Sequence, residues 1–184
     1  MRKLLYAFGL TSALVFALAA HAAAPNFAGT WTLDKSKSQG LSQRIQNAES
    51  VSWVITQTDK EITVDEKITG AGGPGGAPGA GGPGGGGGGR GMMGPQGPRS
   101  YNLDGTETTG ETGRGKFARK ATLSSDGKTL ELVTKTTFQT PDGSEATVTA
   151  SDKLSLSADG KALTVVRHSE SPRGPQDSTF VFNK

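Results

Sequence analysis

The chain has 184 residues, a formal net charge of +3 at pH 7 and no cysteine. Without cysteine there are no disulfides, no thiol catalysis and no thiolate metal sites, so the fold must be stabilised by its own core. At this length one compact domain is expected. Lys and Arg form no run that resembles a nucleic-acid-binding surface, so no nucleic-acid partner is expected.

Residues 1–22 indicate a secretory signal peptide. Two basic residues precede an apolar stretch over residues 4–20, and Ala20-His21-Ala22 supplies small residues for cleavage after Ala22. A retained membrane anchor is the weaker alternative, because a spanning helix needs about 20 apolar residues with stop-transfer flanks. We therefore expect export to the periplasm or the extracellular space, no membrane span after cleavage, and a domain over residues 23–184.

The first stretch after the leader, residues 26–38 (NFAGTWTLDKSKS), predicts a strand around Trp31. Residues 51–56 and 62–68 then alternate apolar and polar side chains. Strict alternation with one apolar face is typical of half-buried antiparallel strands. Between these strands, residues 36–50 are polar and have room for one helical turn.

Residues 70–99 form an insert that contains 17 of the 28 glycines and five of the nine prolines. Such a segment has little apolar surface to offset the entropy of ordering it, so a disordered loop is expected. No P-loop continuation follows the glycines, so a phosphate-binding role is not supported. The insert remains a candidate lid or contact surface for a partner protein.

From residue 101 to the C-terminus, alternating runs are separated by Asp-Gly dipeptides. Asp-Gly between such runs is a strong hairpin signal, because glycine supplies the positive φ of tight turns. The turns are predicted at Asp104-Gly105, Asp126-Gly127, Asp142-Gly143 and Asp159-Gly160. The pattern predicts an all-β fold, a single antiparallel up-and-down barrel of about eight to ten strands.

The residues offer few groups for catalysis. Apart from the leader, His168 is the one histidine, and no nucleophile elbow or paired-histidine metal motif is present. Glu107 and Glu111 lie in a polar stretch where solvated surface is the simpler interpretation. We expect no enzyme activity, no catalytic residues, no metal and no cofactor.

Three charged residues fall on otherwise apolar strand faces: Glu66, Arg119 and Arg167. A buried arginine needs a partner, and an anionic ligand inside the barrel is one way to supply it. The alternative is that each residue lies near a strand end and extends its charged group to water. These three are the candidate ligand-binding residues.

The motif Phe27-x-Gly29-x-Trp31-x-Leu33 resembles the first strand of the calycin superfamily, the lipocalins and fatty-acid-binding proteins. Residues 179–184 (TFVFNK) resemble the last strand of that family, which lies beside the first. The chain is also similar to exported bacterial lipocalin-like proteins that begin GTW-x-L. The resemblance implies a lipocalin-like barrel, closed by the four residues Gly29, Trp31, Phe180 and Phe182.

The chain departs from that family in two places. Phe180 and Phe182 stand where the fatty-acid binders have arginine and tyrosine, so their carboxylate clamp is not carried over. The two-helix lid after the first strand is missing, and the insert is extra.

Two functions follow from these patterns. The first is a monomeric, non-enzymatic exported binding protein with a small apolar or amphipathic ligand in the barrel. The alternative is a structural or interaction module of the cell envelope, in which a solid barrel presents residues 70–99 to a partner protein.

Overall fold

The structure is a computed structural model that describes residues 25–70, 97–112, 115–140 and 142–184. These residues form ten strands and one short helix. The elements in chain order are β1 (Gly29–Leu33), α1 (Gln43–Asn47), β2 (Ser50–Gln57), β3 (Glu61–Thr69), β4 (Arg99–Asn102), β5 (Thr108–Thr112), β6 (Gly115–Leu123), β7 (Thr129–Gln139), β8 (Glu145–Leu156), β9 (Ala162–Ser171) and β10 (Gly174–Asn183).

All ten strands belong to one antiparallel sheet with the order β4-β3-β2-β1-β10-β9-β8-β7-β6-β5. Each strand pairs with its neighbours in the chain, except that β4 and β5 are the two ends of the sheet. The first strand pairs with the last, with Leu33 opposite Phe182. This order confirms the predicted antiparallel up-and-down arrangement of the strands. A side-chain hydrogen bond between the Tyr101 and Thr134 hydroxyls, 2.7 Å long, bridges β4 to β7 across the unpaired seam.

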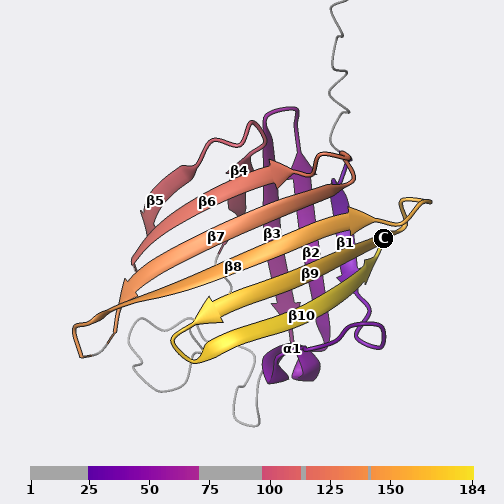
Figure 1. The fold of residues 1–184 in the computed structure, drawn as a ribbon. Coiled ribbons are helices and arrows are strands. Elements are labelled where there is room, and N and C mark those ends of the chain that lie inside the picture. The colour runs from indigo at the N-terminus through magenta and orange to yellow at the C-terminus, as the bar shows by residue number, and fades with distance from the viewer. Residues whose placement is uncertain (1–24, 71–96, 113–114, 141) are drawn as a thin grey trace, which may run out of the picture.

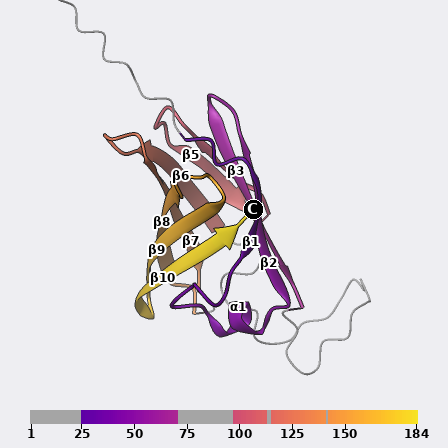
Figure 2. The ribbon, with the colours of Figure 1, turned by 90° about the vertical axis from the view of Figure 1, so that its right-hand side faces the viewer.

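The sheet folds over on itself into two layers. Strands β1–β3 run steeply across the back of the molecule, and β6–β10 run diagonally across its front (Figure 1). Seen from the side, the two layers face each other and α1 lies at one end of the space between them (Figure 2). The inward side chains of both layers therefore share one interior.

Alternation places the apolar residues of each strand in that interior. The core includes two fully buried large aromatic side chains, Trp31 and Phe182. Trp53 is also buried, and its ring centroid lies 5.1 Å from that of Phe182. Aliphatic residues from β2, β3, β7, β8 and β9 complete the cluster, namely Val51, Ile55, Ile62, Val64, Leu130, Leu132, Leu154, Leu163 and Val165. Side chains thus fill the apolar part of the barrel.

Trp31 is buried where the first strand, β1, pairs with the last, β10. Its side chain is fully buried, and its indole N–H donates a 2.8 Å hydrogen bond to the carbonyl of Phe27. The ammonium of Lys184 lies 4.9 Å from the centroid of the Trp31 ring. Gly29 has a φ of +142°, and a Cβ there would approach Lys184 Cε to 2.7 Å. The first and last described residues of the sheet therefore pack around one indole.

The structure differs from the sequence interpretation at two strands. β5 was not expected, because its sequence TTGET has no apolar alternation. Arg99, assigned to the end of the 70–99 insert, lies in β4 opposite Val64. The predicted signal peptide and residues 71–96 of the insert lie outside the described residues. In the part of the chain that the structure describes, no helix has the length and apolar character needed to cross a bilayer.

We predict that Trp31→Ala lowers the free energy of unfolding by about 3–5 kcal/mol, because it removes a fully buried large aromatic side chain. Urea denaturation followed by circular dichroism measures this loss. Thr30→Ala, at the exposed neighbouring position of β1, is the control and should change stability by less than about 0.5 kcal/mol. A loss below about 1 kcal/mol for Trp31→Ala would contradict the closure role.

Candidate functional site

Five charged side chains occur on inward-facing positions toward one end of the barrel. We call them the interior polar cluster, which consists of Glu66, Arg99, Arg119, Asp152 and Arg167. They come from five different strands, β3, β4, β6, β8 and β9, respectively. Each shares its strand face with residues of the apolar core, so the pleat of the sheet turns all of them inward.

Arg167 and Asp152 form a tight pair across β8 and β9. The Asp152 carboxylate accepts hydrogen bonds of 2.6 Å from Arg167 Nε and 2.9 Å from Arg167 Nη2. Both side chains are largely buried, with exposed fractions of 16% and 5%. Burial by itself lowers the pKa of Arg167, but the carboxylates of Asp152 and Glu66 raise it above its ordinary value. Arg167, a predicted ligand-binding residue, is therefore paired within the protein.

Glu66 faces a second arginine. Its carboxylate lies 3.8 Å from Arg99 Nη2, and both side chains are mostly buried. The guanidinium carbons of Arg99 and Arg167 each lie 5.8 Å from the ring centroid of Trp53. Trp53, a member of the apolar core, thus lies beside both arginines, and each of the two arginines has a carboxylate near it.

Arg119 is the exception in the interior polar cluster. The residue is only 8% exposed, and its Nε has no hydrogen-bond partner. Every Asp and Glu of the chain lies within the described residues, and none of them forms an ion pair with Arg119. Burial lowers the pKa of Arg119; Tyr101 opposes this effect and Arg99 adds to it. An arginine keeps its proton even so, and the interior therefore holds one positive charge without a counter-charge.

Apolar side chains continue beyond Arg119 along the inward face of the long front strands. Phe117 and Phe138 are half-buried there, and Val148 is opposite Thr136 on the neighbouring strand. Val148 is 8% exposed and does not belong to the main core cluster. This end of the interior therefore combines an unpaired cation with an apolar wall.

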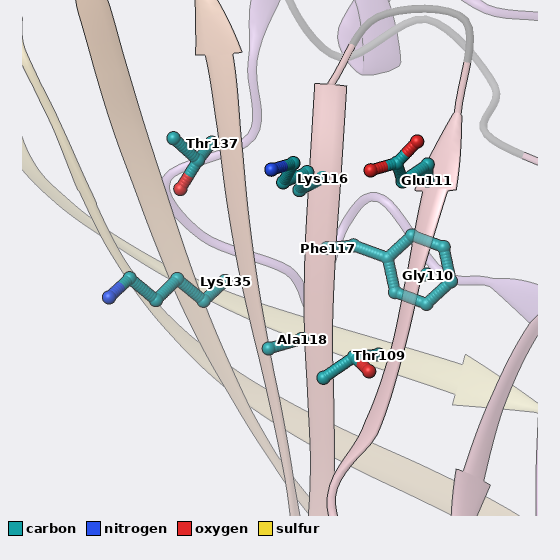
Figure 3. Close-up of a pocket in the computed structure, with 8 residues that line it drawn as sticks. All are labelled: Thr109, Gly110, Glu111, Lys116, Phe117, Ala118, Lys135 and Thr137. Carbon is teal, nitrogen blue, oxygen red and sulfur yellow. The ribbon is translucent and has the colours of Figure 1, made fainter.

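Two hollows are found on the described part of the molecule, and neither is enclosed by the barrel. A groove of about 410 Å³ lies over β5, β6 and β7, between Lys116, Lys135 and Glu111 (Figure 3). A second hollow of about 320 Å³ is lined by Lys35 and residues next to α1. Side chains thus pack the apolar half of the barrel, and Arg119, Arg167 and Glu66 line neither of these two hollows.

His168 lies on the outer face of β9. Its Nδ1 is 2.7 Å from the Asp177 carboxylate and its Nε2 is 3.7 Å from that of Glu170. The imidazole is 49% exposed and lines neither of these two hollows. The described residues include no group of three or more His, Asp or Glu side chains placed to hold a metal ion. Glu107 and Glu111 are exposed.

Sequence reasoning missed two members of the cluster. Asp152 lies on the same strand face as Leu154 and Leu156, so the sequence alternation could have identified it as an inward-facing acidic residue. Arg99 alternates with Tyr101 in the same way, but the composition of the preceding insert concealed it. Arg167 lies close enough to Glu66 to interact with it electrostatically, and Arg119 does so with Arg99. Trp31, Phe180 and Phe182 belong to one core cluster.

No protein-family model matches the chain, and no curated protein matches it either. Among solved structures, a zebrafish ileal bile acid-binding protein complexed with cholic acid is similar in fold. The two chains share 13% sequence identity with a TM-score of 0.45, over 86% of this chain and 98% of that one.

We predict that Asp152→Asn lowers the free energy of unfolding by about 3 kcal/mol, because it leaves the buried Arg167 charge uncompensated. Urea denaturation checks the value. The control is Asp65→Asn, which removes an exposed pair with Lys67 at 3.9 Å and should cost less than about 1 kcal/mol. Equal effects of the two substitutions would mean that Arg167 is solvated.

The His168 environment predicts a pH effect. The hydrogen bond to Asp177 raises the pKa of His168 above its ordinary value of 6.5. The protonated ring therefore stabilises the fold fully below pH 6.5, and this contribution is lost as the pH rises through the folded-state pKa. An NMR titration should show the raised pKa, and Asp177→Asn should lower it. A pKa unchanged by Asp177→Asn would contradict the contact.

Proposed function

We propose that this protein is a non-enzymatic, exported binding protein for a small amphipathic anion. The observation that carries the proposal is the buried Nε of Arg119, which has no partner inside the barrel. An unpaired buried guanidinium is costly, and an anionic head group would supply both the counter-charge and the hydrogen-bond acceptor. The barrel would then act by enclosing that head group away from water.

The surroundings of Arg119 favour an amphipathic ligand over a purely apolar one. Large side chains fill the apolar half of the barrel, so an alkyl chain would not replace the core. Phe117, Phe138 and Val148 provide an apolar wall at the polar end. A ligand with one negative group and an apolar body would match both features, because it neutralises the cation and covers the wall.

Export is part of the proposal. Its support is the sequence of residues 1–22, which has the basic, apolar and small-residue regions of a signal peptide. Fractionation of the producing cells, with N-terminal sequencing of the purified protein, tests it. A protein that begins at Ala23 outside the cytoplasm is expected, and one that keeps residues 1–22 in the cytoplasm would contradict export.

We predict that the protein binds dodecanoate more tightly than dodecanol, and that Arg119→Gln removes this preference. The loss should be roughly tenfold or more, because a hydrogen-bonded contact between charged groups contributes about 1.5–3 kcal/mol. Isothermal titration calorimetry with both ligands measures it. Lys120→Gln is the matched control, since Lys120 is the next residue of β6 and is exposed on the opposite face.

The same substitution should stabilise the ligand-free protein. Arg119→Gln removes an unpaired buried charge, so the free energy of unfolding should rise by about 1 kcal/mol. A fall in stability would indicate that Arg119 has a structural role. Equal binding of dodecanoate and dodecanol by the unmodified protein would contradict the proposed function itself.

A second candidate function is a structural or interaction module of the cell envelope. The filled apolar half favours it, because a solid barrel is a scaffold that needs no ligand. The predicted contact segment, residues 70–99, lies mostly outside the described residues. Deleting residues 71–96, which leaves Arg99 and β4 in place, distinguishes the two functions. Lost capture of an envelope partner with unchanged dodecanoate binding supports the scaffold, whereas the reverse supports ligand binding.

A further inference from the structure

Phe117 lies between the unpaired Arg119 and the backbone of Gly110. The guanidinium carbon of Arg119 is 4.0 Å from the centroid of the Phe117 ring. Gly110 is opposite Phe117 in the pairing of β5 with β6. The Phe117 side chain extends from β6 across β5 and ends over Gly110 (Figure 3). Cation, ring and glycine thus form a stack of three layers.

The stack explains why residue 110 is a glycine. Gly110 is absent from the residues with positive φ, so its backbone conformation is open to other amino acids. A Cβ at this position, however, would lie 2.6 Å from Phe117 Cζ and 2.9 Å from Phe117 Cε1. Any side chain at residue 110 would therefore displace the ring. The glycine is required for the space that it leaves.

The stack also explains how the Arg119 guanidinium is held in position without an ion pair to a carboxylate. A ring contact uses the flat face of the guanidinium and leaves the N–H groups in its plane free to donate. Arg167 shows the contrast, because it has aromatic neighbours too but its N–H groups are taken by Asp152. Phe117 holds the Arg119 cation while leaving its donors available.

We propose that Phe117 is a positioning residue for anion binding, and that Gly110 makes room for it. This inference rests on the proposed function, because it assigns to Phe117 the task of presenting Arg119 to the anionic head group. Loss of the ring contact should weaken binding of the charged group more than binding of the apolar part of the ligand, to which Phe117 also contributes as part of the apolar wall.

The test is the ratio of dodecanoate to dodecanol affinity in a double-mutant cycle of Phe117→Leu and Gly110→Ala. Each single substitution should reduce the ratio roughly fivefold, the size expected for a partly desolvated cation–π contact. The double variant should be no worse than Phe117→Leu, because no ring remains for the added methyl group to displace. Thr109→Ala, on the exposed face beside Gly110, should leave the ratio unchanged.

A ligand-free measurement accompanies the cycle. Ring currents from Phe117 should shift the NMR signals of the Arg119 side chain upfield, and both single substitutions should abolish this shift. Circular dichroism shows whether each variant is folded.

The outcomes separate the two proposals. If the unmodified protein prefers dodecanoate through Arg119 but both single variants keep the full ratio, the positioning role is wrong and the proposed function stands. If the unmodified protein shows no preference for dodecanoate, the proposed function fails and the positioning role fails with it. If each single variant lowers the ratio of dodecanoate to dodecanol affinity and the two effects add in the double variant, Gly110 acts independently of the Phe117 ring. That result also overturns the proposal that Gly110 makes room for the ring.

Discussion

The barrel depends on one constraint: every second residue of each strand faces an interior that contains little water, and its side chain must be stable there. The pairing of β1 with β10 imposes this, because it joins the first and last strands of the chain in the middle of the sheet. The two ends of the sheet, β4 and β5, then lie at an unpaired seam. Trp31 lies at the junction of β1 and β10 and is fully buried. The apolar half of the interior follows from the alternation of its strands, and each inward residue there packs against residues from the opposite layer.

The same constraint applies to the charged residues at the other end of the barrel interior. A charge turned inward by the pleat must find a partner, and Asp152 provides one for Arg167 at hydrogen-bond distance. Glu66 is the carboxylate partner of Arg99, at the longer distance of 3.8 Å. Arg119 has an aromatic ring beneath it and no carboxylate, which leaves an uncompensated charge in a stabilised fold. Such exceptions to polar pairing are typical of functional sites, where stability is given up for binding.

Much of this architecture could be predicted from the sequence because antiparallel strands encode their faces with period two. Three of the Asp-Gly dipeptides lie in hairpin turns with the expected positive φ at glycine, for example +69° at Gly127 and +67° at Gly160. The fourth, Asp104-Gly105, also has a positive φ at glycine, but it connects β4 to β5, which do not pair, so the hairpin predicted there is wrong. β5 escaped prediction because it is an end strand in which Gly110 replaces an apolar inward residue. Local composition cannot show that an aromatic ring on the neighbouring strand fills that position.

The charged site was predictable only in part. The sequence places Arg119, Arg167 and Glu66 on inward faces, but pairing is a property of strand register. Asp152 becomes the partner of Arg167 only when β8 and β9 align residue 152 with residue 167. Arg119 is aligned with Thr134, a residue that cannot neutralise it. Register thus decides which of three arginines remains available to a ligand.

The most direct test of this account is the NMR signal of the Arg119 Nε–H group during a titration with dodecanoate. The account predicts that this signal moves downfield in step with binding, because the group gains a carboxylate acceptor that it lacks in the free protein. The Arg167 Nε–H signal should stay in place, since its acceptor is already Asp152. Saturable binding that leaves the Arg119 signal unmoved would contradict the central claim.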